Sequence, residues 1–299
     1  MRFLSLLLPL ASLFLVAFAE ELEKQQLRRG SPPSPGKAPK IEKIGLFVEG
    51  FTPESISRTK KTISVGLEGV EIVELLLSDL QSALSLNIGI FAAPSDVIPG
   101  SLPTVKQGMD IIEGFVQKGS LLFSQMSSSS VLCKEFIYSG ESTTNSPFIY
   151  DGQCVGPLTG IGPFEKDSRA ITIKVGDGNG GSKSNNAFTY GGFYFKDADK
   201  KENCIILAKA TPRSDSEALI EFDESADPEA VVVACKHGNG AAILSGIYID
   251  QNKSFLKSLL EKIPDQGKLP DVVELLSEVP EFSELVLGFL MSLFFTAAK

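Results

Sequence analysis

Short apolar runs separated by helix-forming segments mark the first half of the chain. Three of these runs are continuously apolar, which is typical of strands buried on both faces: Ile44–Val48, Ile88–Ala92 and Leu121–Phe123. A fourth and more polar run over Val70–Leu75 predicts one further strand.

Two helices are predicted between these strands. Thr52 and Pro53 are residue types that favour an N-cap and a first helical position, so a helix should begin there and end near Gly66. A second helix is expected over about Val105–Lys118, stopping at Gly119. The order strand, helix, strand, strand, helix, strand predicts an α/β fold around a mostly parallel sheet.

The second half of the chain alternates apolar and polar residues between turns rich in Gly and Asn, which favours antiparallel strands that extend the same sheet. The predicted strands are Ile171–Val175, Phe188–Phe195, Cys204–Ala210, Ala218–Phe222, Val231–Cys235 and Ala241–Ser245. The stretch Gly176–Asn186 lacks the lysine-containing order of a phosphate-binding loop and the alternating acidic residues of a calcium-binding loop. We therefore expect a hairpin tip there.

The two ends of the chain differ in composition from its middle. Residues 1–19 have the basic start, the apolar stretch and the Ala17-Phe18-Ala19 site of a cleaved signal peptide, with an uncleaved anchor as the alternative. Residues 20–40 are charged and then Pro-rich, which predicts a disordered leader. The chain is therefore expected to be secreted or to reside in the lumen of the secretory pathway.

The domain itself is expected over residues 41–265, followed by an amphipathic, apolar helical tail over residues 266–299. The tail is shorter than a membrane span, so we expect it to dock on the domain or to make peripheral contact with a membrane. A removed lipid-anchor signal is the alternative.

Charge and histidine content exclude several classes of function. Lys and Arg total 28 against 37 Asp and Glu, which gives a net charge of −9 and argues against a protein that tracks nucleic-acid phosphates. The single histidine, His237, rules out mechanisms that need one His as base and another as ligand. Its place in a predicted hairpin tip indicates a solvated turn residue. We expect no metal and no cofactor.

Four cysteines fit an oxidising compartment but are too few for a disulfide scaffold. Cys204 begins one predicted strand and Cys235 ends another, so the two could face each other, although three connectivities are open. Free buried thiols are an equal alternative. Asn252 lies in an acceptor sequence that the secretory route could glycosylate.

Several stretches, in the right order over about 200 residues, resemble the N-terminal domain of eukaryotic biotin–protein ligases, which is also found as a stand-alone protein. They are Gly50–Ser55, Ile111–Gly119, Gly152–Pro157, Thr189–Phe195, Val231–Gly240 and Leu244–Gly246. The resemblance implies a class I glutamine-amidotransferase-like (flavodoxin-like) fold, with a mostly parallel sheet flanked by helices and extended by antiparallel strands. The chain shows no sign of the ligase's glycine-rich adenylate-binding sequence, so biotin ligation is not implied.

The presumed nucleophile of this family is replaced in the chain. Members carry a strand–turn–helix elbow of the form G-x-C-A-G-G, whose Cys would be the nucleophile. Aligning Gly119 and Cys133 with the family places Met126 at that Cys, followed by Ser127. A thioether has no ionisable proton, so Met126 cannot supply the thiolate that this chemistry needs.

The partners of the nucleophile are changed as well. Ala93 and Pro94 stand where the family has a Gly-Gly pair with oxyanion-facing amides, and proline has no N–H to donate. Where the family has a His near an acid, this chain has Tyr248 and Asp250.

These changes predict a secreted, non-catalytic amidotransferase-like protein, either a pseudoenzyme or a binding module, for a small molecule or a protein partner. Its site would be a small pocket rimmed by Met126, Ser127, Tyr248 and Asp250, with Met126 as a packing residue, the serine run as a polar turn and Tyr248 as a rim aromatic. The alternative is a secreted hydrolase or amidotransferase-like enzyme whose nucleophile is Ser124 or Ser127. A third hypothesis is an interaction protein that acts through its loops.

Overall fold

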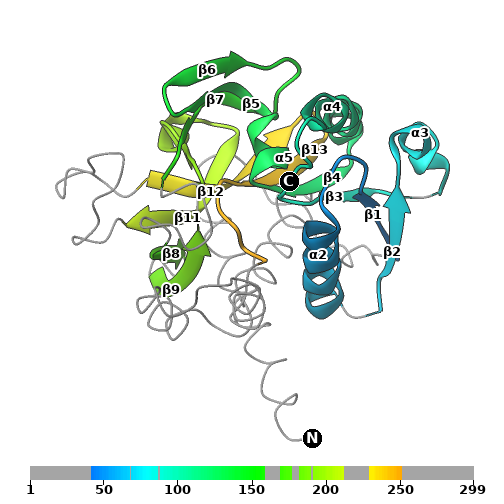
Figure 1. Cartoon of the computed structure of the whole chain (residues 1–299), viewed down its shortest axis with the longest axis horizontal. Helices are drawn as coiled ribbons and strands as arrows, with labels where there is room; N and C mark the ends of the chain where they lie inside the picture. Colours follow the sequence, from blue (N-terminus) through cyan, green and yellow to red (C-terminus); the bar gives the residue numbers. More distant parts are fainter. Residues whose placement is uncertain are drawn as a thin grey trace, which may run out of the picture.

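Thirteen strands form one mixed sheet with helices on both faces in the computed structural model, which describes residues 42–67, 69–86, 88–158, 169–176, 182–189, 191–211 and 229–250 (Figure 1). The strands are β1 (Lys43–Phe47), β2 (Glu71–Leu75), β3 (Ile90–Ala93), β4 (Leu121–Gln125), β5 (Cys133–Tyr138), β6 (Glu141–Thr144), β7 (Tyr150–Gly156), β8 (Arg169–Gly176), β9 (Ser182–Thr189), β10 (Tyr194–Phe195), β11 (Cys204–Thr211), β12 (Glu229–His237) and β13 (Gly240–Ser245). The helices are α2 (Pro53–Gly66), α3 (Leu77–Leu80), α4 (Leu102–Lys118) and α5 (Ser127–Ser130), with short 3₁₀ turns η1 (Ala83–Leu86) and η2 (Ala198–Lys200). The predicted α/β class is confirmed.

The parallel part of the sheet has the order β2-β1-β3-β4-β13. Successive residues of β1 belong to different core clusters, Leu46 to one and Phe47 to the other. The helix α4 packs Met109 and Ile112 against Phe47, and α2 packs Ile63 against the opposite cluster. Helices therefore cover both faces of the sheet (Figure 1). This two-sided burial is the physical reason for the continuously apolar runs in the sequence.

The helix boundaries follow from capping residues. Thr52 Oγ1 accepts a hydrogen bond from the backbone N–H of Ser55 over 3.3 Å, and Pro53 opens α2. The helix α4 ends at Gly119, whose φ of 125° is accessible to glycine but strained for other residues. Both boundaries agree with the sequence pattern.

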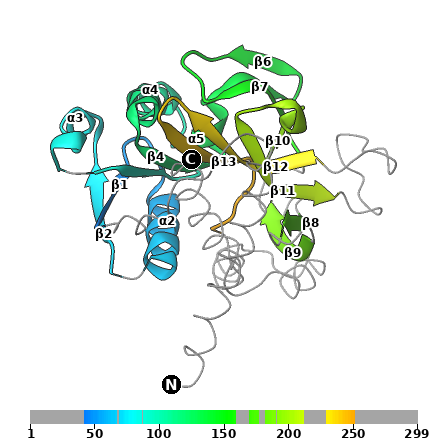
Figure 2. The same cartoon turned by 180° about the vertical axis from the view of Figure 1, so that it is seen from behind.

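The sheet continues from β13 through strands that are mostly antiparallel, although β5 and β7 run parallel to each other. The strand β12 forms a hairpin with β13, and beyond β12 the sheet runs through β10, β7, β5 and β6 (Figure 2). The strand β11 also pairs with β12 and carries β8 and then β9 as a side branch. The sequence analysis missed β5, β6 and β7.

Of the strands predicted in this part, one is divided in the structure and another lies outside the described residues. The strand predicted over Phe188–Phe195 is divided, because Gly191 and Gly192 adopt positive φ angles between β9 and β10. The strand predicted over Ala218–Phe222 lies outside the described residues.

All four cysteines form disulfides. One joins Cys133 of β5 to Cys154 of β7, and the other joins Cys204 of β11 to Cys235 of β12. Cys204 and Cys235 lie directly opposite each other in the antiparallel ladder.

The predicted signal peptide, the leader, Asn252 and the C-terminal tail lie outside the described residues. Among the residues that are described, no helix is long and apolar enough to cross a membrane.

Candidate functional site

A sharp turn between β4 and α5 holds Met126 at the carboxyl edge of the parallel sheet. Met126 has φ 52° and ψ −121°, a region that normally requires glycine, so the turn is a strained strand–turn–helix elbow. Its backbone N–H donates to Ser245 O over 2.7 Å, and its carbonyl accepts hydrogen bonds from the amides of Ser129 and Ser130. The Met126 residue is only 9% exposed. The elbow is thus fixed on both sides by β13 and α5.

Buried serines hold this elbow together. Ser128 Oγ accepts a hydrogen bond from the amide of Gln125 and lies 2.9 Å from the carbonyl oxygen of the same residue. Ser124 Oγ and Ser129 Oγ lie 2.8 Å apart, and Ser129 Oγ also accepts from the amide of Ser245. These serine side chains are buried within the protein, so their hydroxyls satisfy buried backbone groups rather than facing a substrate. Of the candidate nucleophiles, Ser124 is therefore enclosed, and Ser127 is partly exposed.

The two backbone positions that could stabilise an oxyanion are both unsuited to that role. The N–H of Ser127, the residue after the elbow, donates to Ser95 O over 3.2 Å. Ala93 ends β3, and Pro94 follows it with no N–H to donate. A substrate oxygen would find neither donor free, although oxyanion stabilisation needs preorganised donors.

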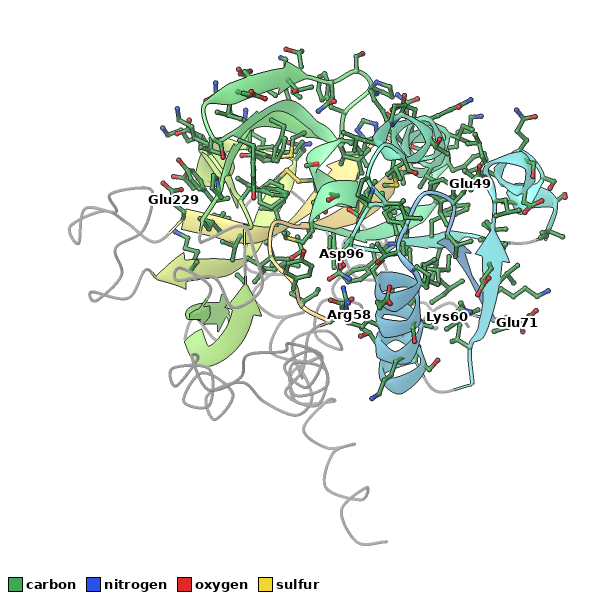
Figure 3. All side chains as sticks on the ribbon, viewed as in Figure 1. Glu49, Arg58, Lys60, Glu71, Asp96 and Glu229 are labelled. Atoms are coloured by element: carbon green, nitrogen blue, oxygen red, sulfur yellow. A yellow bond between two sulfur atoms is a disulfide. The ribbon has the colours of Figure 1, made fainter. Side chains whose placement is uncertain are left out.

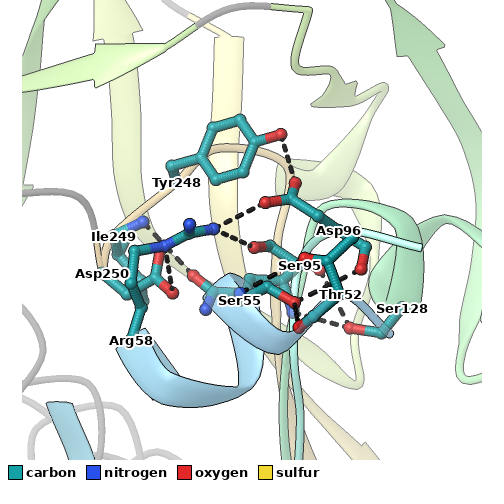
Figure 4. A network of polar contacts seen from close by, with 10 residues as sticks. Thr52, Ser55, Arg58, Ser95, Asp96, Ser128, Tyr248, Ile249 and Asp250 are labelled. Atoms are coloured by element: carbon teal, nitrogen blue, oxygen red, sulfur yellow. Dashed lines mark hydrogen bonds and ion pairs between the residues drawn. The ribbon is translucent and has the colours of Figure 1, made fainter. Parts of the chain in front are cut away.

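Arg58 joins the elements that meet at this edge. Its Nη2 donates to Asp96 Oδ2 over 2.6 Å and to Ser95 Oγ over 3.0 Å, and its Nε lies 3.4 Å from Asp250 Oδ2 (Figure 4). Arg58 projects from the side of α2 that faces Asp96, away from Lys60 (Figure 3). One guanidinium thus connects α2, the loop after β3 and the segment after β13.

Tyr248 is part of the same network. Its hydroxyl donates to Asp96 Oδ1 over 2.7 Å (Figure 4), and the residue is only 5% exposed. The prediction that Tyr248 is a rim aromatic was therefore wrong, because its phenol is directed inward to a carboxylate. Gln125 Oε1 accepts from the amide of Ile249 over 3.4 Å, which ties this segment to β4.

Asp250 has an unusual electrostatic environment. Its carboxyl is fully buried, and burial raises its pKa above the ordinary 3.8, while the positive charge of Arg58 acts in the opposite direction. Asp250 Oδ1 has no hydrogen-bond partner within the described part of the chain, which adds to the cost of ionising the group. The carboxyl therefore favours its protonated form more than an exposed aspartate does.

We expect Asp250→Asn to change how stability depends on pH. Because the pKa of Asp250 is raised on folding, the native state binds this proton more tightly than the unfolded chain does. The associated stability is present below the ordinary pKa and is lost as the pH rises through the raised value. Between the ordinary and the raised pKa, the free energy of unfolding of Asp250→Asn should rise relative to that of the wild type by about 1.4 kcal/mol for each pH unit. Urea unfolding at a series of pH values measures this, and parallel profiles for the two proteins would contradict it.

His237 lies at the other end of the sheet. It closes β12 opposite Gly240, at the end of the sheet where β4 begins two strands away, whereas Met126 follows the other end of β4, roughly 16 Å away along the strands at about 3.3 Å per residue. Its Nε2 contacts Glu113 of α4, and its side chain is mostly buried. The expectation of a solvated turn residue was wrong, because the hairpin end packs against α4. No described imidazole can act on the elbow.

The sequence analysis missed Arg58, Ser95, Asp96 and Gln125. Asp96 could have been found from its place four residues after the predicted strand Ile88–Ala92, because the carboxyl ends of parallel strands meet at one edge. Nothing in the sequence singles out Arg58 from the other basic residues of its helix. In the described part of the chain, no group of His, Cys, Asp and Glu side chains could hold a metal ion.

The fold and the site together define an α/β protein with a strained strand–turn–helix elbow at the carboxyl edge of its parallel strands. Residues 148–293 match the family model "Biotin-protein ligase, N terminal", which confirms the predicted resemblance to that domain. The match begins just before β7, so it includes Tyr248 and Asp250 but neither Met126 nor the residues at the end of β3.

The solved structures to which this protein is similar have low sequence identity with it. A glutamine amidotransferase from Thermotoga maritima is 11% identical at a TM-score of 0.45, with 87% of this chain and 100% of that one covered. A cytoplasmic protein from Salmonella typhimurium LT2 is 10% identical at a TM-score of 0.41, covering 78% and 99%. A ThuA-like protein from Parabacteroides merdae is 12% identical at a TM-score of 0.40, covering 69% and 79%. No curated protein sequence matches the chain significantly.

Proposed function

We propose that the chain is a secreted, non-catalytic relative of the amidotransferase-like proteins that serves as a binding module. The observation that carries this proposal is the elbow itself. Met126 stands at the strained position, and the following amide of Ser127 is already engaged by Ser95 O. The nucleophile and the oxyanion donor are thus missing from the same turn.

The contacts of Tyr248 and Asp250 support the same proposal. The hydroxyl of Tyr248 is committed to Asp96, and the carboxyl of Asp250 to Arg58. Both groups are thus already engaged by other side chains of a buried network. A general base has to lie within hydrogen-bond reach of the proton that it takes.

The alternative function, a hydrolase that uses serine, depends on Ser127. Ser127 is partly exposed, whereas Ser124, Ser128 and Ser129 are buried. Ser127 is therefore the one of these serines that a substrate could reach. A hydroxyl still needs an activating base, and the imidazole of His237 is at the opposite end of β4.

We expect neither the wild type nor Met126→Cys to turn over activated esters or glutamine-type amides above background. A new thiol at position 126 would have only the short helix α5 to lower its pKa, and no imidazole to accept its proton. Side-by-side assays of the wild type, Met126→Cys and Ser127→Ala test this expectation.

The control for these assays is Ser142→Ala, which removes an exposed hydroxyl on the edge strand β6, away from the elbow. Wild-type turnover that disappears in Ser127→Ala but persists in Ser142→Ala would overturn the proposal and establish the serine enzyme. Activity that is lost only when His237 is replaced would also overturn it.

The secretory part of the proposal rests on the signal sequence and is supported by the pairing of all four cysteines, since disulfides persist in oxidising compartments. N-terminal sequencing of protein from the culture medium or the secretory lumen should begin at Glu20. Recovery of intact Met1 in a soluble cytosolic fraction would contradict this prediction.

A further inference from the structure

The two disulfides differ in their access to solvent. Cys133 and Cys154 are both 0% exposed, so a reagent reaches their bond only if the surrounding core opens. Cys235 is equally buried, but Cys204 is only partly buried and packs at the margin of the core. Cys204 Sγ lies 3.7 Å from the side-chain oxygen of the exposed Asn203. Cys204 is thus the more exposed partner of this second bond.

The backbone around the second disulfide is held independently of the sulfur–sulfur bond. The strands β11 and β12 share six registered residue pairs, from Cys204 opposite Cys235 to Ala210 opposite Glu229. Asn203 adds two contacts to Lys236: its carbonyl accepts from the Lys236 amide over 2.7 Å, and its Nδ2 donates to the Lys236 carbonyl over 3.1 Å. Opening the disulfide would therefore leave the two strands paired.

The same disulfide lies at a junction of the sheet. In the part of the chain that the structure describes, β8 and β9 join the main sheet only through β11, and β11 joins it only through β12. Cys204 is the first residue of β11. The bond therefore fastens one end of the strand on which the whole branch depends.

We propose that Cys204 is a site of thiol–disulfide exchange for a dithiol oxidoreductase, whereas Cys133–Cys154 is a permanent structural bond. A thiolate of the dithiol attacks Cys204 Sγ, forms a mixed disulfide there and expels the Cys235 sulfur, which takes up a proton. The second thiolate of the dithiol then attacks the dithiol's first sulfur, which is bonded to Cys204 in the mixed disulfide. This closes the disulfide of the oxidised dithiol and releases Cys204, which takes up a proton and becomes a thiol. Two electrons and two protons pass to the protein, and the dithiol becomes a disulfide.

The exchange requires only that a partner can reach the partly exposed Cys204 and that the ladder survives its reduction. It is independent of whether the elbow of Met126 performs any chemistry. Its consequence is a change in the tethering of the β8–β9–β11 branch, with the parallel core left intact.

Differential alkylation of the intact secreted protein tests the proposal. The folded protein is treated with dithiothreitol as the dithiol probe, quenched with N-ethylmaleimide at intervals and mapped by peptide mass spectrometry. Cys204 and Cys235 should become alkylated at least about ten-fold faster than Cys133 and Cys154, because exchange rates depend on access to the sulfur. Equal rates, or faster labelling of Cys133 and Cys154, would overturn the proposal.

Two matched single variants identify the sulfur that is attacked. In Cys235→Ser, the remaining Cys204 should form a mixed disulfide with glutathione disulfide at least about ten-fold faster than Cys235 does in Cys204→Ser. The reverse order would overturn the assignment of Cys204.

Hydrogen exchange of the wild type, before and after limited reduction, needs no variant that might fail to fold. Protection of the β11 amides should fall by about ten-fold or more, with β13 unchanged, because the paired strand opens more often once its covalent tether is cut. Equal loss of protection in β11 and β13 would mean that reduction opens the whole domain, and would overturn the proposal.

Discussion

Replacing Arg58 by Met should lower the free energy of unfolding by about 3–5 kcal/mol at neutral pH, because it removes one partner of a buried ion pair. The guanidinium of Arg58 is the counter-charge of Asp250, whose side chain is fully buried, and it also binds Asp96 and Ser95. Without it, Asp250 must either stay ionised in a poorly solvated place or take up a proton. Urea unfolding measures the loss, and the slope of the free energy of unfolding against urea concentration should stay as in the wild type.

The matched control is Lys60→Met, on the same helix but on the side away from the network (Figure 3). Lys60 pairs with Glu74, and both side chains are exposed, so this change should cost no more than about 1 kcal/mol. A loss in Arg58→Met as small as that of the control would show that the network contributes little. Adding Asp250→Asn to Arg58→Met should recover part of the loss, since the two residues are coupled.

Replacing Leu122 by Ala should cost about 2–5 kcal/mol, which is the range for a fully buried leucine in a core that cannot collapse around the cavity. Leu122 is 0% exposed in β4, where it is paired with Phe91 of β3 and Ala242 of β13. Neighbouring strands on both sides hold its surroundings in place. Chemical denaturation of the purified variant measures the change.

Leu76→Ala is the control for Leu122→Ala, because it makes the same chemical change at a residue that is 49% exposed. It should alter the free energy of unfolding by about 0.5 kcal/mol or less. A cost below about 1 kcal/mol for Leu122→Ala would contradict the central place of β4 in the sheet.

The parallel half of the fold could be predicted because its physics is local in the sequence. A strand covered by helices on both faces is apolar where it is buried, as β3 is throughout, β1 over residues 44–47 and β4 over residues 121–123. The edge strand β6 was missed for the opposite reason. Its residues, Glu141–Thr144, are all exposed. The sequence there has no alternation of apolar and polar positions from which a strand could be predicted.

The candidate site was only partly predictable. Met126 could be assigned to the elbow because the order of motifs around it follows a known pattern. Arg58 could not be assigned, because its partners Asp96 and Asp250 lie 38 and 192 residues away along the chain. Such a network is created by the folded topology, and single residues of common types carry no trace of it in the sequence.

The backbone of the elbow also bears on how active enzymes are recognised. Met126 keeps a left-handed conformation that costs on the order of 1–3 kcal/mol. The Met126 amide donates to Ser245 O, and the amides of Ser129 and Ser130 donate to the Met126 carbonyl, so backbone hydrogen bonds hold this conformation in place. Shape and chemistry at this turn are thus separable properties of the chain. If the proposed non-catalytic function holds, a strained turn alone does not identify an enzyme, so the side chain at the turn and its acceptor have to be the criterion.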